Sequence, residues 1–466
     1  MLARIILITL LGPAALIASD ARPTSDRPGI DAHAATNACA AIDARAAVHI
    51  RLESSVPADG DTVPAPENIR LLFNLPVNPA LSHVRLVGAN ETEWTLPVEL
   101  GEQPELLVAT VPALSSGAYR VEWRVVSSDG HPVSGEFVFH VPSPDRPDSA
   151  LAVSAGVDGD AAAAADANGA GDPEPDETTV SASEGASQEA GVERFPTMLA
   201  VWRGLATSSL MALAGLLTFI VWITPDPSPR TIRLARILAV VAPILLAVHV
   251  GAWIRSTTPP GGLDLPWIRA LLGSSGSGRA ETTRFLCALA ALIALWRRHE
   301  GTAAILTLTA VGVSGAIGHA LAVDRMLSVP ARSAHLLAAA LWFGGLLVLI
   351  TSQKDRPEFR SQVRRISAIA LASVVAIAFT GLVQSVLLLP SPAGLVTTIY
   401  GRAVLAKTAG LIILIAFGAT NRRLFMPRLA DGHGATALQR SCTVETWVMI
   451  AVILLAGFLS YIPIPE

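Results

Sequence analysis

Five side chains in this sequence have the type and placement needed to bind a transition-metal ion. Asp129 and His131 lie two positions apart in a turn, and His49 opens the same region of short alternating segments. His319 and His335 lie in two apolar runs joined by a short connection. Imidazole nitrogen together with carboxylate oxygen suits an ion such as Cu(II). An Asp-Gly pair by itself also forms an ordinary turn, so two ligands do not make a site.

Cysteine usage, charge and motif content exclude several other functions. The chain has only three cysteines, Cys39, Cys287 and Cys442, which fall in different environments of the topology predicted below. Neither a disulfide framework nor a thiolate cluster is predicted, so a metal site is expected to use nitrogen and oxygen. The net charge is -4 and no basic patch occurs, which excludes nucleic acid as a partner. No nucleotide-binding motif supports an ATP-driven pump.

Residues 49–142 have the pattern of a small β domain. Tyr119, Val121 and Trp123 alternate with charged residues, which predicts a strand with one buried face. Turn signals such as Asp59-Gly60 recur between segments of this kind. The sequence therefore predicts an all-β antiparallel sandwich, Ig-like or cupredoxin-like in type.

The segments on either side of this domain lack a pattern that could bury a core. Residues 1–21 carry a basic residue and then a short apolar stretch, which predicts a signal peptide. Residues 22–48 predict a disordered leader. Residues 143–196 are rich in Ala, Gly, Ser, Asp and Glu, which predicts a flexible acidic linker.

Long apolar runs dominate residues 197–466. Apolar residues make up 51% of the chain, charged residues 15%, and the mean hydropathy is +0.50. Because about 20 apolar residues span the hydrocarbon of a bilayer, these runs predict an all-α polytopic membrane bundle of about eight transmembrane helices. The expected spans lie near 203–223, 234–254, 283–297, 302–322, 331–351, 367–388, 403–419 and 445–463. Only residues 298–301 separate the third span from the fourth, so a merged hairpin would change the count.

Basic residues gather in alternate connections between the spans, for example at Arg297 and Arg298 and at Arg364 and Arg365. This asymmetry predicts that those connections face the cytoplasm. Signal peptide and charge bias together place the β domain on the periplasmic side of a multi-pass inner-membrane protein. The lipid bilayer is therefore an expected partner.

Three histidines are predicted to lie at one level of the bundle, towards its outer side: His249, His319 and His335. Ionisable residues within membrane spans are functional candidates because their burial is costly. For His249 we expect a plain hydrogen bond to a neighbouring helix. For His319 and His335 the short loop between their helices makes a shared metal site as well supported as two separate structural roles.

Two stretches of the β domain closely resemble the CopC family of periplasmic copper carriers. They are HIRLESSVPADG at 49–60 and GAYRVEWRVVSSDGHPVSG at 117–135. The resemblance covers the whole domain and implies a Cu(II) site formed by His49, Asp129 and His131. In the family the first histidine is the mature amino terminus, whereas here a leader precedes His49. The resemblance therefore implies an amine ligand only if processing exposes that residue.

The membrane region resembles the core of the CopD family, which is associated with copper import. The matching segments are SGAIGHA at 314–320, RSAHLLAAALWFGG at 332–345, YGRAVLAK at 400–407 and GATNRR at 418–423. The resemblance implies that His319 and His335 are ligands for copper in transit. Gly344 and Gly345 are expected to allow close helix packing instead of binding a ligand.

Taken together, these features predict a fused copper donor and channel that is not an enzyme. It is expected to bind Cu(II) outside the cytoplasm and to pass copper inward, for import, homeostasis or resistance. Tethering raises the concentration of the donor at the channel mouth. Other periplasmic copper carriers or a reductase are further expected partners, and the oxidation state of copper in the membrane stays open. Two alternatives remain: a haem-binding electron-transfer protein serving the copper domain, and a membrane-anchored copper buffer or sensor.

Overall fold

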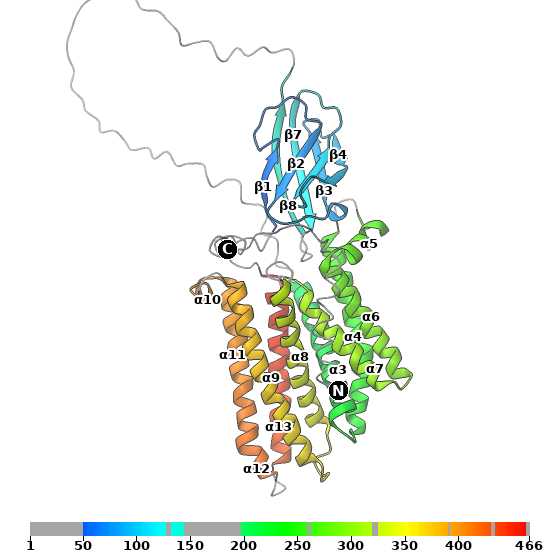
Figure 1. The fold of residues 1–466 in the computed structure, drawn as a ribbon, viewed down its shortest axis with the longest axis vertical. Coiled ribbons are helices and arrows are strands. Elements are labelled where there is room, and N and C mark those ends of the chain that lie inside the picture. The colour runs from blue at the N-terminus through cyan, green and yellow to red at the C-terminus, as the bar shows by residue number, and fades with distance from the viewer. Residues whose placement is uncertain are drawn as a thin grey trace, which may run out of the picture.

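A β-sandwich sits at one end of a long helical bundle in the computed structural model of the chain (Figure 1). The structure describes residues 50–126, 132–143, 197–258, 262–318, 325–389, 392–429 and 434–462. The predicted signal peptide, the leader and nearly all of the predicted linker lie outside these ranges. We call the end of the bundle next to the sandwich the sandwich end, and the opposite end the far end.

The sandwich consists of two four-stranded antiparallel sheets, which confirms the predicted fold class. One sheet has the order β1 (Leu52–Val56), β2 (Asn68–Phe73), β6 (Leu106–Thr110) and β5 (Val98–Leu100). The other has the order β4 (Glu93–Leu96), β3 (His83–Gly88), β7 (Gly117–Val126) and β8 (Pro132–Val141). The alternation seen in the sequence is the cause, because every second side chain of a strand faces the core. Val121 and Val125 of β7 are fully buried, for example, at 0% exposure.

Helices make up the remainder of the described chain. They are α3 (Thr197–Thr218), α4 (Pro229–Thr257), α5 (Leu265–Ser274), α6 (Gly276–Trp296), α7 (Glu300–Val313), α8 (Arg325–Thr351), α9 (Phe359–Leu388), α10 (Gly394–Thr397), α11 (Ile399–Thr420), α12 (Met426–Arg428) and α13 (Ala435–Leu459). A π-helical turn, η4 (Phe219–Ile223), follows α3, and a second one, η7 (Asn421–Phe425), follows α11. A single 3-10 turn, η5 (Ser314–Ala316), follows α7.

Six of the described helices are long and apolar enough to cross a membrane, so the prediction of about eight spans was approximate. The six are α3 with η4, α4, α8, α9, α11 with η7 and α12, and α13. The predicted third and fourth spans form the shorter hairpin α6–α7. Helix α7 has only 14 residues, or about 21 Å at 1.5 Å per residue, and α6 carries three charged residues near its start, Arg279, Glu281 and Arg284.

Helix α3 forms the centre of the bundle and packs against α4, α7, α8 and α13. Its crossing with α8 is close because glycines meet there. A Cβ atom on Gly344 would overlap the backbone of Gly215, and a Cβ atom on Gly215 would overlap the carbonyl oxygen of Ala340. At Gly345 a Cβ atom would lie 2.8 Å from the Ile366 side chain. The close packing expected at Gly344 and Gly345 is therefore present.

The sandwich and the bundle share a buried apolar contact. Leu81 and Val126 of the sandwich form one cluster with Trp253 at the end of α4 and with Trp267 and Leu271 of α5. Val126 is the last residue of β7, the strand that leads into the predicted copper-binding turn. The end of the sandwich at which β7 ends therefore faces the bundle.

Two hydrogen bonds flank that apolar contact. Asn78 Nδ2 donates to Ser274 Oγ at 2.8 Å, and Arg124 Nη2 donates to the carbonyl oxygen of Ser256 at 3.3 Å. Helix α5 presents its side of the contact because its start is capped: Asp264 Oδ1 accepts a hydrogen bond from the backbone of Trp267 at 2.6 Å. Apolar burial and polar contacts therefore fix the same pose.

Candidate functional site

His335 is the one predicted site residue that falls within the described part of the chain. It lies on α8, ten residues after the helix begins at the sandwich end, or about 15 Å along the helix axis. Its Nδ1 atom is 3.0 Å from Thr380 Oγ1 on α9. The next residue of α9, Gly381, has no side chain, and a Cβ atom there would lie 3.7 Å from the imidazole.

The hydroxyl of Thr380 faces Nδ1 of His335, and the backbone of Ile377 is a further hydrogen-bond partner of the imidazole. Thr380 Oγ1 donates its own proton to the carbonyl oxygen of Ala376 at 2.6 Å, so towards the imidazole it acts as an acceptor. His335 therefore carries its proton on Nδ1, an assignment that follows from the hydrogen-bond network. The lone pair of Nε2 is then available. A metal-binding histidine has this arrangement, in which the second ring nitrogen donates to a neighbouring group.

The other four predicted site residues, His49, Asp129, His131 and His319, lie outside the described residues. The structure therefore shows neither the proposed Cu(II) site nor the pairing of His319 with His335. Across the ranges it does describe, no three His, Cys, Asp or Glu side chains come close enough together to hold a metal ion. A metal site in this part of the chain would need other donor atoms as well.

His249 belongs to a buried ion-pair network, so the expected contact with a neighbouring helix is present. Its Nε2 atom lies 3.3 Å from Glu281 Oε1 on α6. Arg284 Nη1 donates to both oxygens of Glu281 at 3.0 Å and Arg284 Nη2 donates to Thr207 Oγ1 at 3.2 Å. His249, Glu281 and Arg284 are each no more than 2% exposed. This network fastens α6 to α3 and α4.

Positive charge is in excess at this level of the bundle. Arg203 and Arg284 lie within electrostatic range of Arg332, and Lys407 lies within range of both Arg332 and His335. Among the described helices at this level, only Glu281 supplies a negative charge. A hydrated cation is repelled by such a layer. A metal ion would reach His335 more easily from a ligand held close by.

A second buried polar cluster lies nearer the far end of the bundle, and we call it the Glu445 cluster. Glu445 of α13 is 1% exposed. Trp342 Nε1 of α8 donates to its Oε1 atom at 2.9 Å, and Asn421 Nδ2 of η7 donates to its Oε2 atom at 2.9 Å. The same Asn421 nitrogen lies 4.0 Å from Cys442 Sγ. Four residues from three parts of the chain therefore form one cluster around a carboxylate.

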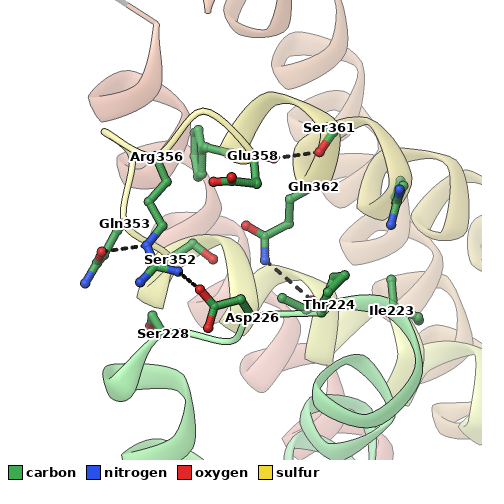
Figure 2. A pocket seen from close by; sticks show the side chains of 13 residues that line it. Ile223, Thr224, Asp226, Ser228, Ser352, Gln353, Arg356, Glu358, Ser361 and Gln362 are labelled. Atoms are coloured by element: carbon green, nitrogen blue, oxygen red, sulfur yellow. Dashed lines mark hydrogen bonds and ion pairs between the residues drawn. The ribbon is translucent and has the colours of Figure 1, made fainter.

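Figure 2 shows a pocket at the far end, where η4 meets the connection between α8 and α9. Its volume is about 180 Å³. Arg356 is paired with Asp226 across this pocket, and Gln362 Nε2 donates to Thr224 Oγ1 at 3.5 Å. The carboxylate of Asp226 is thus already matched by a guanidinium. This surface pocket is far along the helices from His335 and is no candidate for a metal centre.

The Glu445 cluster and the ion pairs of His249 are not predicted from the sequence, because each predicted span begins at the edge of an apolar run. Glu445 is the first residue of a predicted span, whereas α13 begins ten residues earlier, at Ala435. Arg203 likewise lies six residues inside α3. The signal that could have found them is the helical repeat continuing past a charged residue.

Two family models match this chain. The CopC domain matches residues 52–142, and Copper resistance protein D matches residues 360–459. The first lies within the β-sandwich, and the second covers α9 to α13. The segment of α8 that contains His335 lies between the two matched ranges.

Similar proteins agree with the family models. Copper transport protein CutJ of Bacillus subtilis is 25% identical over 442 residues, which cover 89% of this chain and 74% of CutJ. Copper resistance protein C of Xanthomonas campestris pv. juglandis is 36% identical over 106 residues, which cover 21% of this chain and 84% of that protein. The crystal structure of CopC from Methylosinus trichosporium OB3b is 30% identical and covers 22% of this chain and 100% of its own, with a TM-score of 0.20.

Proposed function

Because the chain belongs to the CopC family and joins a CopC domain to a CopD domain, we propose that it binds Cu(II) outside the cytoplasm and passes copper inward across the cell membrane. The observation that carries the proposal is the docked pose. The end of the sandwich where β7 leads into the predicted copper turn contacts α4 and α5. His335 lies at the same end of the bundle.

In this proposal His49, Asp129 and His131 hold Cu(II) in the sandwich, and His319 and His335 receive copper in the membrane. The tautomer of His335 supports its role, since Nε2 keeps its lone pair. The excess of positive charge around His335 supports direct hand-over from a docked carrier, because a free cation is repelled there. The inner membrane is the proposed location, with the sandwich in the periplasm. Other copper carriers deliver the ion to the sandwich, or a reductase acts on the bound ion.

Copper accumulation in cells tests the membrane part of the proposal. His335→Ala and His319→Ala are each expected to reduce the copper content of cells at least about tenfold relative to the parent chain, because each removes a ligand. His299→Ala is the matched control, since this histidine is exposed in the far-end turn between α6 and α7. Parent-like accumulation by both ligand variants would refute the transport role.

A positioning variant separates ligand chemistry from loss of structure. Thr380→Val keeps the size of the side chain but removes the hydroxyl that accepts from Nδ1 of His335 and leaves the backbone of Ile377 as a partner, so the tautomer and the ring orientation are held less firmly. We expect copper accumulation between those of the parent and of His335→Ala, with recovery in Thr380→Ser. Equal accumulation by Thr380→Val and the parent would show that the tautomer does not matter.

A Soret absorbance band in the purified protein would instead favour the haem-binding alternative.

A further inference from the structure

Glu445 is a buried carboxylate whose negative charge is not matched by a positive side chain in the described part of the chain. It lies ten residues inside α13, and its contacts are the neutral donors of Trp342 and Asn421. Glu281, the other buried carboxylate of the described helices, has Arg284 and His249 beside it. An unmatched charge deep in a membrane protein is costly, so Glu445 needs a proton or a metal cation as its counter-ion.

Soft donor atoms lie on the same face of α13. Cys442 is 1% exposed and precedes Glu445 by three residues, so the two side chains lie one above the other. Met449 is 4% exposed and follows Glu445 by four residues, one turn nearer the sandwich end. Thiolate and thioether sulfur are the protein ligands that Cu(I) prefers. The inward face of α13 therefore carries sulfur, oxygen and sulfur in sequence.

The side-chain oxygen of Asn421 is an unpaired hydrogen-bond acceptor within the described part of the chain. Asn421 is 8% exposed, its Nδ2 atom contacts Glu445 and Cys442, and its Oδ1 atom is buried without a hydrogen-bond partner among the described residues. The residue lies in the π-helical turn η7, and π-helical turns within helices often mark functional sites. Nδ2 faces Glu445 and Cys442, so a half-turn of the amide would bring the unpaired Oδ1 to the cluster as a metal ligand.

The cluster also lies on a direct line from His335. Trp342 follows His335 by seven residues on α8, so both side chains share one face of the helix and are about 10 Å apart along its axis. Glu445 contacts that tryptophan. A cation leaving His335 towards the far end therefore meets the Glu445 cluster next.

We propose that Cys442, Glu445 and Asn421 form a second metal site in the bundle, which takes one monovalent soft cation. The assignment of copper as that cation rests on the proposed function, and it requires a one-electron reductant, the reductase named there, to convert the Cu(II) held by the sandwich to Cu(I) before the ion reaches this site. Binding keeps the proton within the site: the cation bonds to the thiolate of Cys442, and the displaced thiol proton is taken up by the carboxylate of Glu445. The site then changes from one negative charge to neutral, whereas a divalent ion would leave a positive charge in the membrane. The expectation from the sequence of nitrogen and oxygen ligands alone does not hold for such a site.

Silver binding to the purified full-length chain tests the site, because Ag(I) copies the ligand preference of Cu(I) and has no accessible second oxidation state in water. Equilibrium dialysis against a competing chelator gives the number of Ag(I) ions per chain, in a Cys39→Ala background. Cys442→Ser is expected to bind one ion fewer than this parent, and Glu445→Gln is expected to bind that ion about tenfold more weakly. Cys287→Ser is the matched control, since Cys287 is the other free cysteine of the described bundle.

X-ray absorption identifies the atoms that bind silver. Ag–S scattering that is present in the Cys39→Ala, Cys287→Ser chain and falls when Cys442→Ser is added would support the site, since the methionine thioethers are the same in both chains; equal Ag–S scattering in the two chains, or none in either, would overturn it. Parent-like silver binding by both Cys442→Ser and Glu445→Gln would also overturn it, leaving Glu445 as a proton site only. Loss of copper accumulation bears on the proposed function alone. A chain that moves copper but binds no silver at Cys442 would refute only this site.

Discussion

At the scale of single residues, the described part of the bundle contains two buried carboxylates with opposite surroundings. Glu281 is held by Arg284 at 3.0 Å and by His249 at 3.3 Å, so its charge is matched within the protein. Glu445 contacts only neutral donors among the described residues. The first arrangement is that of a structural brace, and the second is that of a site that can accept a cation. The same residue type thus has two roles, which its neighbours decide.

The brace at Glu281 gives a stability prediction. Glu281→Gln leaves the guanidinium of Arg284 buried without its counter-charge, which is expected to lower the free energy of unfolding by about 3–5 kcal/mol. Denaturant titration of the protein in detergent, followed by tryptophan fluorescence, measures the change. Glu300→Gln is the control, since Glu300 is exposed at the start of α7, and it should leave the midpoint in place. A parent-like midpoint for Glu281→Gln would show that the network contributes nothing.

At the scale of the elements, the crossing of α3 and α8 sets the positions of His335 and of the Glu445 cluster. Helix α8 carries His335 at one level and Trp342 at the other, and its close contact with α3 at Gly344 and Gly215 lies just beyond Trp342. A displacement of α8 would move both residues together. Close packing of the two glycines is therefore expected to affect function as well as stability.

Gly344→Ala tests this crossing. The added methyl group would overlap the backbone of Gly215, which flexible side chains cannot relieve, so unfolding is expected to become easier by about 1–3 kcal/mol. Gly251→Ala is the matched control on α4: nothing lies within 4 Å of its new methyl group, so stability should hold or rise by up to about 1 kcal/mol. Thermal unfolding in detergent compares the two. Equal effects would mean that helix propensity, not the crossing, sets the result.

The sequence predicted those elements whose pattern depends on burial alone. Ile69 and Leu71 of β2 alternate with other residues because one face of the sheet is buried, and both have 0% exposure. The six long apolar helices could be predicted for the same reason. Helix α6 was harder, because Glu281 and Arg284 look unfavourable in a span until their pairing is seen. Charge pairing depends on tertiary contacts, which one helical stretch does not contain.

The candidate sites divide in the same way. His335 could be predicted from its place in an apolar run, whereas its tautomer depends on Thr380, 45 residues away in the chain. The Glu445 cluster brings together α8, η7 and α13, and no local pattern joins Trp342 to Asn421. Ligands that a short motif carries are visible in a sequence. Ligands that the packing of helices assembles are not.

At the scale of the whole molecule, the sandwich is seated on the bundle and not merely tethered to it. Leu81 and Val126 are 1% and 2% exposed because Trp253, Trp267 and Leu271 cover them. If the sandwich were only tethered and moved freely, these apolar side chains would be exposed to water and not buried against α4 and α5. Docking holds one end of the sandwich against the end of the bundle where α8 begins, ten residues before His335. In the proposed function this shortens the path of copper from the sandwich to His335.

A thiol crosslink tests whether this docked pose exists in the membrane. Asn78→Cys with Ser274→Cys places two thiols where the parent side chains are 2.8 Å apart, in a chain that also carries Cys39→Ala and Cys287→Ser. After treatment with a short crosslinker and cleavage at a protease site inserted in the 143–196 segment, the two fragments are expected to stay joined on a denaturing gel. Ser116→Cys with Ser274→Cys is the control, because Ser116 precedes the opposite end of β7, about 30 Å away at 3.3 Å per residue. Equal crosslinking of both pairs, or of neither, would contradict a fixed pose.

If the docked pose is the one that transfers copper, the crosslinked chain should also accumulate copper at the parent rate, since the sandwich then never has to leave the bundle.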